Sequence, residues 1–349
     1  MIPRFVMLLP LALAMIASTC ARGQTPLSSV PTEPLGLMNV AHEKNGLAGE
    51  GIQPWHIRGT YHTYSQNGKP EFEGTYEEWW VGHTRYKRTF STPQFTQTDY
   101  ATGTALLREG AQEWPKGPEL LLRESLIDPL PESALLSKFQ LRERQESAGK
   151  ATLNCVSMLY PVRPNLAVGG EFFPRACFDP SIPALRMYSV GSAQKLFYGH
   201  IVSFQGHYLA EQLQFYFAGK LAADLNIEVI ETLKGSPDNA IAPSGNVVPV
   251  DLDNIMIDEV GRSHWPQLLR SAVPVYPADA KSMRAQGTVN IEAIIGEDGH
   301  LKNAKILDGN PFLRQASLDA VNQWLYRPFE VMGKPRTVKV RLHVIFQMA

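Results

Sequence analysis

Between residues 51 and 234 the sequence consists of short segments rich in Thr, Tyr, Phe and Trp, with Gly, Asn or Pro between them about every ten residues. Such segments favour β-strands, because branched and aromatic side chains pack well on a pleated surface. Asn67-Gly68 is the clearest tight-turn signal among them. We therefore expect one long, curved antiparallel sheet, a half-barrel, and a chain of the α+β class.

One segment interrupts this pattern with helical periodicity. It reads GPELLLRESLIDPLP, in which Pro118 suits a first helical turn and Pro129 and Pro131 end the helix. Its apolar face is expected to contain Leu121, Leu122, Leu126 and Ile127. Such a helix buries its leucines against one face of the sheet.

Composition suggests how the rest of the chain is divided. A length of 349 residues with 44% hydrophobic content permits two domains with separate cores. Residues 235–250 collect Gly, Ser, Pro, Asn and Asp without periodicity, which is typical of a linker. Residues 251–271 are ambiguous and could contain a short strand and a turn or short helix. The expected organisation is a signal peptide at 1–23, a disordered or extended segment at 24–50, a β-rich domain at 51–234, the linker at 235–272 and a second domain at 273–349.

The first residues are typical of a secretion signal. Arg4 precedes an uncharged run, and Ala21-Arg22-Gly23 suits cleavage before Gln24. The mature chain is then expected outside the cytoplasm. The alternative is a retained membrane anchor, although the apolar run is shorter than the roughly 20 residues that a spanning helix needs.

Cys155 and Cys177 remain as a pair once Cys20 has left with the signal. In an oxidising compartment this favours a disulfide, and the alternative is two buried free thiols. No Cys-x-x-Cys motif and no Cys–His spacing predicts zinc. We expect no metal site and no cofactor.

Catalytic signatures are missing from the sequence, which has no Gly-x-Ser-x-Gly, phosphate loop, dinucleotide fingerprint or His-Glu-x-x-His. Glu77 and Glu78 precede two tryptophans, but adjacent strand residues point to opposite faces and cannot act on one bond. His56 and His62 share a strand parity and are expected to be exposed. The near balance of 33 basic and 34 acidic residues gives no field that would attract nucleic acid. We expect a protein that is not an enzyme, and a hydrolase of cell-wall sugar is the weakest alternative.

The region from residue 273 onward alternates regular helices and strands. Pro277 and Gly287 bound a short helix, and Asp298-Gly299 turns one strand into the next. The first strand is expected to direct one set of side chains inward: Val289, Ile291, Ala293 and Ile295.

A second helix and a closing strand complete this unit. Asn310 and Pro311 begin the helix. Its expected buried stripe contains Phe312, Leu313, Ala316, Ala320, Val321, Trp324 and Leu325. The closing strand is expected to alternate Val338, Val340, Leu342, Val344 and Phe346 inward with Thr337, Lys339, Arg341 and His343 outward. The predicted order is helix, strand, strand, helix, strand.

These residues resemble the C-terminal domain of TonB, the energy transducer of Gram-negative envelopes. The resemblance covers residues 273–348 and is carried by Tyr276-Pro277, Ala280, Gly287, Val289, Asp298-Gly299, Ala320-Val321, Trp324, Tyr326, Pro328, Gly333 and Phe346. It implies a periplasmic domain that takes part in transmembrane transport by binding TonB-dependent outer-membrane receptors or other peptides. An extended peptide would add to an edge of the small sheet.

The resemblance points to the closing strand as that edge. The expected peptide-binding residues are Thr337, Val338, Lys339, Val340, Arg341, Leu342, His343, Val344, Ile345 and Phe346. The sequence departs from a TonB transducer in its short linker, since about 35 flexible residues span only about 35 Å. The resemblance therefore predicts peptide binding without predicting a bridge between two membranes or coupling to the proton-motive force.

The N-terminal region more weakly resembles the LolA/LolB-like carriers of the periplasm. The text that carries this resemblance is GTYEEWWVGHTRYKR, the Leu-rich helix before Pro131, and FQGHYLAEQLQFY. It implies a concave sheet with a lid helix, offering aromatic and leucine side chains to a lipid or acyl chain. A periplasmic lipid or lipoprotein carrier is the alternative function.

Overall fold

The computed structural model of the protein describes residues 30–49, 51–65, 67–114, 117–148, 151–159, 173–190, 194–257 and 268–348. The expected signal peptide or anchor at residues 1–23 lies outside these ranges. Among the described helices, none is both long enough and apolar enough to cross a membrane.

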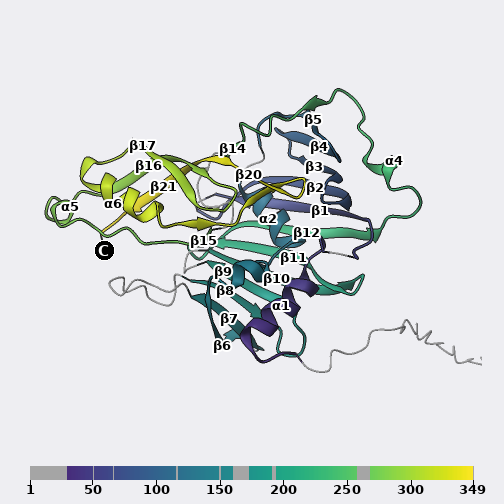
Figure 1. The fold of residues 1–349 in the computed structure, drawn as a ribbon, viewed down its shortest axis with the longest axis horizontal. Coiled ribbons are helices and arrows are strands. Elements are labelled where there is room, and N and C mark those ends of the chain that lie inside the picture. Colours follow the sequence, from purple (N-terminus) through teal and green to yellow (C-terminus); the bar gives the residue numbers. More distant parts are fainter. Residues whose placement is uncertain are drawn as a thin grey trace, which may run out of the picture.

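A single antiparallel sheet of 13 strands dominates the structure (Figure 1). Its first half contains β1 (Trp55–Tyr64), β2 (Pro70–Gly82), β3 (Arg85–Ser91), β4 (Thr96–Thr102) and β5 (Leu106–Gly110). Its second half contains β6 (Gln140–Ala148), β7 (Ala151–Leu159), β8 (Pro174–Phe178), β9 (Leu185–Val190), β10 (Gln194–Phe204), β11 (His207–Phe217) and β12 (Lys220–Thr232). The small strand β13 (Val248–Pro249) adds to β5 at one end.

The strand order explains how one chain builds so wide a sheet. The order is β13-β5-β4-β3-β2-β1-β12-β11-β10-β9-β8-β7-β6, so each half is a meander between neighbouring strands. The first half runs outward from β1 to β5, and the second runs inward from β6 until β12 pairs with β1. The sheet is not closed, because β13 and β6 form its two ends. The expected long antiparallel sheet and the α+β class are confirmed.

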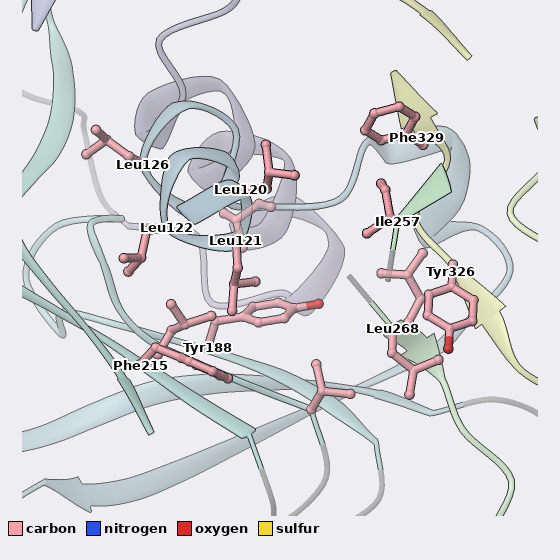
Figure 2. Packing of buried hydrophobic residues seen from close by; sticks show 14 of the residues in the cluster. Leu120, Leu121, Leu122, Leu126, Tyr188, Phe215, Ile257, Leu268, Tyr326 and Phe329 are labelled. Atoms are coloured by element: carbon pink, nitrogen blue, oxygen red, sulfur yellow. The ribbon is translucent and has the colours of Figure 1, made fainter. Parts of the chain in front are cut away.

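Helices cover one face of this sheet. The segment that crosses from β5 to the far end at β6 contains α2 (Gly117–Ile127) and α3 (Ser133–Leu136). Figure 2 shows Leu121 and Leu122 of α2 directed toward Tyr188 and Phe215 of the sheet. All four residues of the predicted apolar face of α2 are buried, with at most 3% of their surface exposed.

The prediction that residues 24–50 are disordered or extended is wrong for most of its described part. Residues Pro34–Asn45 form α1, which begins where the Glu33 carboxylate accepts hydrogen bonds from the amides of Leu35 and Gly36. The helix buries three apolar side chains, Leu37, Met38 and Ala41, and contacts β11 and β6. Tertiary packing therefore stabilises a helix whose own sequence has weak apolar periodicity.

Asn45 joins α1 to the sheet. Its Nδ2 donates to the carbonyls of Ala41 and Pro183, and its Oδ1 accepts from the amide of Leu185, all at 2.7 Å. A buried amide that uses both donors and its acceptor fixes the helix end, because each lost bond would leave a desolvated polar group.

The expected disulfide is present in the second half of the sheet. Cys155 on β7 and Cys177 on β8 face each other in register, and their sulfur atoms are bonded. Both residues are fully buried. The bond joins two neighbouring strands, so it closes the loop of residues between them.

The C-terminal unit is a small sheet with helices on one face. Its order is β14-β21-β16-β17. The elements are β14 (Met256–Ile257), α5 (Ala278–Ser282), β16 (Gly287–Ile295), β17 (Leu301–Asp308), α6 (Pro311–Val321) and β21 (Val338–Phe346). Two small pairs accompany them: β15 (Leu268–Arg270) with β18 (Leu325–Tyr326), and β19 (Phe329–Val331) with β20 (Lys334–Arg336).

The sequence predicted the interior of this unit well. The inward sets of β16 and β21 are all buried. The side chain of Asn310 caps α6 by accepting from the amide of Phe312, and the indole of Trp324 donates to the carbonyl of Ala272. The prediction is wrong for one residue of the expected buried stripe, since Phe312 in the first turn of α6 is 45% exposed.

The region expected to be a linker follows the edges of both sheets. After α4 (Asp238–Ile241), β13 pairs with β5 of the large sheet. After six intervening residues, β14 pairs with β21 of the small sheet. This part of the chain therefore runs from an end strand of one sheet to an end strand of the other.

Candidate functional site

The small sheet contains the strand that the sequence predicts to bind peptides. The predicted range begins at Thr337, one residue before β21. The strand is held on one side by β16, which pairs with it over nine residues from Gly287↔Phe346 to Ile295↔Val338. Its inward side chains are buried in the apolar core, which fixes the position of its backbone.

The other side of β21 receives a strand from the same chain. β14 runs parallel to it, with Met256 opposite Lys339 and Ile257 opposite Val340. The amide of Lys339 donates to the carbonyl of Ile255 at 2.9 Å. The N–H of Lys339 therefore points away from β16, and by strand alternation so do the backbone groups of every second residue along β21.

Two buried isoleucines hold β14 in place. Ile255 and Ile257 are each 2% exposed, whereas Met256 between them is 38% exposed. Figure 2 shows Ile257 between Phe329 on one side and Leu268 and Tyr326 on the other. From the sequence these residues are expected to lie in a linker, because a two-residue strand gives too short a pattern to reveal its partner.

A turn before β14 directs the chain onto this edge. The Asp251 carboxylate accepts from the amide of Asp253 at 3.0 Å and from the side-chain amide of Asn254 at 2.7 Å. These hydrogen bonds, that of Asn254 first, hold the pKa of Asp251 below its ordinary value. Asp and Asn side chains commonly form such local turns.

Residues 272–348 match the family model of the Gram-negative bacterial TonB protein C-terminal. The match confirms the resemblance seen in the sequence. The matched residues include β16, β17, α6 and β21. The strand β14 precedes them in the sequence and lies outside the match.

A curated relative shows the same extent of similarity. "Protein TonB" from Klebsiella pneumoniae is 31% identical to this chain over 86 residues. The aligned part is 22% of this chain and 33% of that relative. The chain thus spans about a third of the relative's length, and the similarity describes a domain rather than the whole protein.

Solved structures similar to this chain include a LolA superfamily protein from Nitrosomonas europaea. It is 8% identical, with a TM-score of 0.34, covering 60% of this chain and 97% of that one. A DUF1329 family protein from Desulfovibrio piger is 8% identical, with a TM-score of 0.39, covering 60% and 98%. At these scores the likeness assigns no ligand to the large sheet, so its role as a carrier stays a prediction.

The inner face of the large sheet was the second predicted site, and helices fill much of it. Between α2 and the strands β9, β10 and β11 lies a cavity of about 10 Å³, lined by residues such as Leu126, Tyr198 and Ala210. That volume holds about one water molecule. An acyl chain at this position would require α2 to move.

Buried ion pairs are the main feature of this face that the sequence did not predict. Glu78 is fully buried, and its carboxylate accepts from the Nε and Nη2 of Arg123 at 3.0 and 2.8 Å. Asp99 accepts from Arg108 at 2.7 and 3.0 Å and from Arg88 at 3.1 Å. Burial alone would raise the pKa of Glu78, but the charge and hydrogen bonds of Arg123 lower it overall.

A cavity of about 80 Å³ lies between α2, the large sheet and the β19–β20 pair of the small unit. Trp114 of the large unit contacts Phe329 of the small unit edge to face, with ring centres 5.5 Å apart. Arg327 donates to the backbone carbonyl of Asp128 at 2.5 Å and forms an ion pair with its carboxylate. Burial raises the pKa of the nearby Glu330, partly offset by Arg327. The cavity has room for a few water molecules.

The histidines considered in the sequence lie on the outer face of the large sheet. His56 is 9% exposed, so the expectation that it is an exposed strand residue is wrong. Its ring stacks on Trp79 and contacts Glu77 and Glu231 at 2.8 and 3.0 Å. His62 contacts Asp224 and Glu73 in the same way at 2.8 and 3.2 Å.

In the described part of the chain, one group of three side chains of the kinds that ligate metal ions lies close together. The group is Glu146 with Cys155 and Cys177. Because these two cysteines are bonded to each other, neither offers a thiolate to a metal ion. The acid pair Glu77 and Glu78 divides between the two faces of β2, as strand alternation requires.

Proposed function

We propose that this protein is a non-enzymatic cell-envelope protein that takes part in transmembrane transport. Its small domain binds an extended segment of an outer-membrane receptor, or another periplasmic peptide, by strand addition to β21. The observation that carries this proposal is the pairing of β14, since an edge that accepts a strand from its own chain has the geometry to accept one from a partner. The similarity of residues 272–348 to the TonB C-terminal family supports the same assignment.

In this proposal the peptide is held mainly by hydrogen bonds to the backbone of β21. The Lys339 amide and its neighbours of the same parity offer donors and acceptors to a strand, and neutral hydrogen bonds of this kind contribute about 0.5–1.5 kcal/mol each. Side chains of the peptide add specificity through the apolar contacts that Ile255 and Ile257 now make. The domain division at 51–234, 235–272 and 273–349 and the periplasmic location remain part of the proposal.

The test is a pair of variants at one position. Lys339→Pro removes the N–H that faces outward and leaves the ladder with β16 intact, whereas Lys339→Thr keeps that N–H and changes only an exposed side chain. Fluorescence anisotropy with a labelled peptide from the N-terminal segment of a TonB-dependent receptor should show at least a tenfold weaker affinity for Lys339→Pro. Equal affinities for the two variants would contradict edge pairing.

Lipid or lipoprotein transport by the large sheet is the second candidate function. It is favoured by the position of α2, a leucine-rich helix laid over an aromatic inner face. Native mass spectrometry of the whole protein, recovered without detergent, should then detect a bound lipid mass. Repeated recovery of the protein without any adduct would count against this function.

A further inference from the structure

We infer that the segment Ile255–Ile257 is a built-in competitor for the peptide-binding edge. It occupies the backbone groups of β21 around Lys339, so a partner strand that pairs along the whole edge must displace it. This inference rests on the proposed function and adds two things to it: a closed form of the site and the kind of peptide that opens it.

The ladder that closes the edge is short. β14 pairs with β21 through two residues, whereas β16 pairs with the same strand through nine. Only a few hydrogen bonds hold the backbone of β14, in contrast to the continuous ladder on the other side. The strand β14 is therefore the element of the small sheet that exchanges with least loss of structure.

The buried side chains set the threshold for exchange. Ile255 and Ile257 are each 2% exposed, and removing such aliphatic side chains from water stabilises the closed edge. A partner strand that lacks aliphatic side chains at these two positions would lose that contribution. The site therefore favours an extended peptide that runs parallel to β21 and carries two aliphatic residues at alternate positions.

The chain before β14 keeps the competitor close. Val248 and Pro249 pair with β5, and the amide of Val250 donates to the carbonyl of Leu106 at 2.9 Å. Only residues 251–254 separate this attachment from Ile255, and the Asp251 turn compacts them. A tether this short gives a high effective concentration, so it closes the edge even though the pairing itself is weak.

The competition has a simple quantitative consequence. If the edge is open for only a fraction of the time, the apparent dissociation constant of a peptide rises by the inverse of that fraction. Closure for about 90–99% of the time weakens binding roughly 10- to 100-fold. Variants that empty or lock the edge should move the affinity in opposite directions.

The experiment uses the full chain and a labelled synthetic peptide with the sequence of residues 251–257, DLDNIMI, as the probe. In the opened variant, Ile255→Asn with Ile257→Asn, the tethered strand loses its buried anchors while β21 is unchanged. In the locked variant, Met256→Cys with Lys339→Cys, a disulfide joins two register partners that are both exposed. Wild-type protein treated with the same oxidant and reductant is the control.

We expect the opened variant to bind the peptide at least tenfold more tightly than the wild type. The oxidised locked variant should bind none, and reduction should restore wild-type affinity. Should the opened variant fail to fold, the locked variant alone decides, since it retains both isoleucines. Equal affinity in the opened and wild-type forms, with binding lost only in the locked form, overturns the competitor while leaving the edge function intact. Equal affinity in all three forms contradicts both. If even a folded, opened variant binds no peptide, both the competitor and the proposed function are contradicted.

Discussion

The two sheets of this protein differ in how firmly the rest of the chain holds their strands in place. The large sheet is covered on one face by helices that bury leucines and ion pairs, and its halves are joined by nine residue pairs between β1 and β12. The small sheet has an equally apolar core, but one of its edges is closed only by the two residues of β14. The contrast indicates that the large sheet is a stable platform and that the edge of the small sheet is the exchangeable part.

The largest effect should come from breaking a buried charge pair in the platform. Glu78→Ala leaves the guanidinium of Arg123 without its bidentate partner, and loss of one member of a buried pair costs about 3–5 kcal/mol. The control is Glu77→Ala on the opposite face of the same strand, where a more exposed pair contributes less than about 1 kcal/mol. Urea unfolding measures both. Similar losses in the two variants would show that the inner network does not stabilise the sheet.

The disulfide should have the next largest effect, again confined to the large sheet. Replacing Cys155 and Cys177 together by Ala removes a cross-link between residues 22 positions apart. Such loops typically contribute about 2–4 kcal/mol. The melting temperature should fall, while peptide affinity stays at the wild-type value because the two cysteines pack only among residues of the large sheet, such as Leu153, Met187 and Phe197. A loss of peptide binding in this variant would contradict the division of roles between the sheets.

Contact between the two units should have an intermediate effect. Arg327→Ala removes the ion pair and hydrogen bond to Asp128, and charge-assisted bonds of this type contribute about 1.5–3 kcal/mol. Calorimetry of the wild type should give one unfolding transition, and that of the variant should give two. The matched control is Arg314→Ala on the exposed side of α6, whose Nε donates to the carbonyl of Gly309. A single transition at an unchanged temperature for Arg327→Ala would mean that the units are not coupled through this pair.

The smallest expected effect depends on pH. The hydrogen bond with Asp224, opposed by burial and supported by Glu73, raises the pKa of His62. Protonated His62 therefore stabilises the folded state below the ordinary histidine pKa of about 6.5, and this contribution is lost as the pH rises through the higher folded value. His62→Gln should lower stability by about 0.5–1 kcal/mol at pH 5.5 and by much less at pH 8.5.

Thermal unfolding at the two pH values measures this difference. The control is His200→Asn, at an exposed histidine of β10. A loss from His62→Gln that is the same at both pH values would contradict the raised pKa.

Regular periodicity is what made parts of the structure predictable. Alternation along β16 and β21 gave their inward residues, and the leucines of α2 with their flanking prolines gave that helix. In each case one face is apolar throughout, so the local pattern and the tertiary packing agree.

The remaining features depend on contacts between distant segments. α1 was missed because its few apolar residues become a face only when the sheet is present. Glu78 and Arg123 are 45 residues apart, and each taken alone is typical of an exposed position. The pairing of β14 joins Met256 to Lys339 through two residues, which is too little sequence to carry a register signal.

Hydrogen exchange tests the central claim most directly, because it reports the backbone of the proposed edge. The full protein would be labelled with deuterium with and without a saturating peptide from a TonB-dependent receptor, and the digested fragments compared by mass. Strand addition to β21 with displacement of β14 predicts slower exchange across residues 338–346 and faster exchange across residues 251–257. Protection of residues 301–308 on β17, or of α2 on the large sheet, with no change at β21 would contradict it.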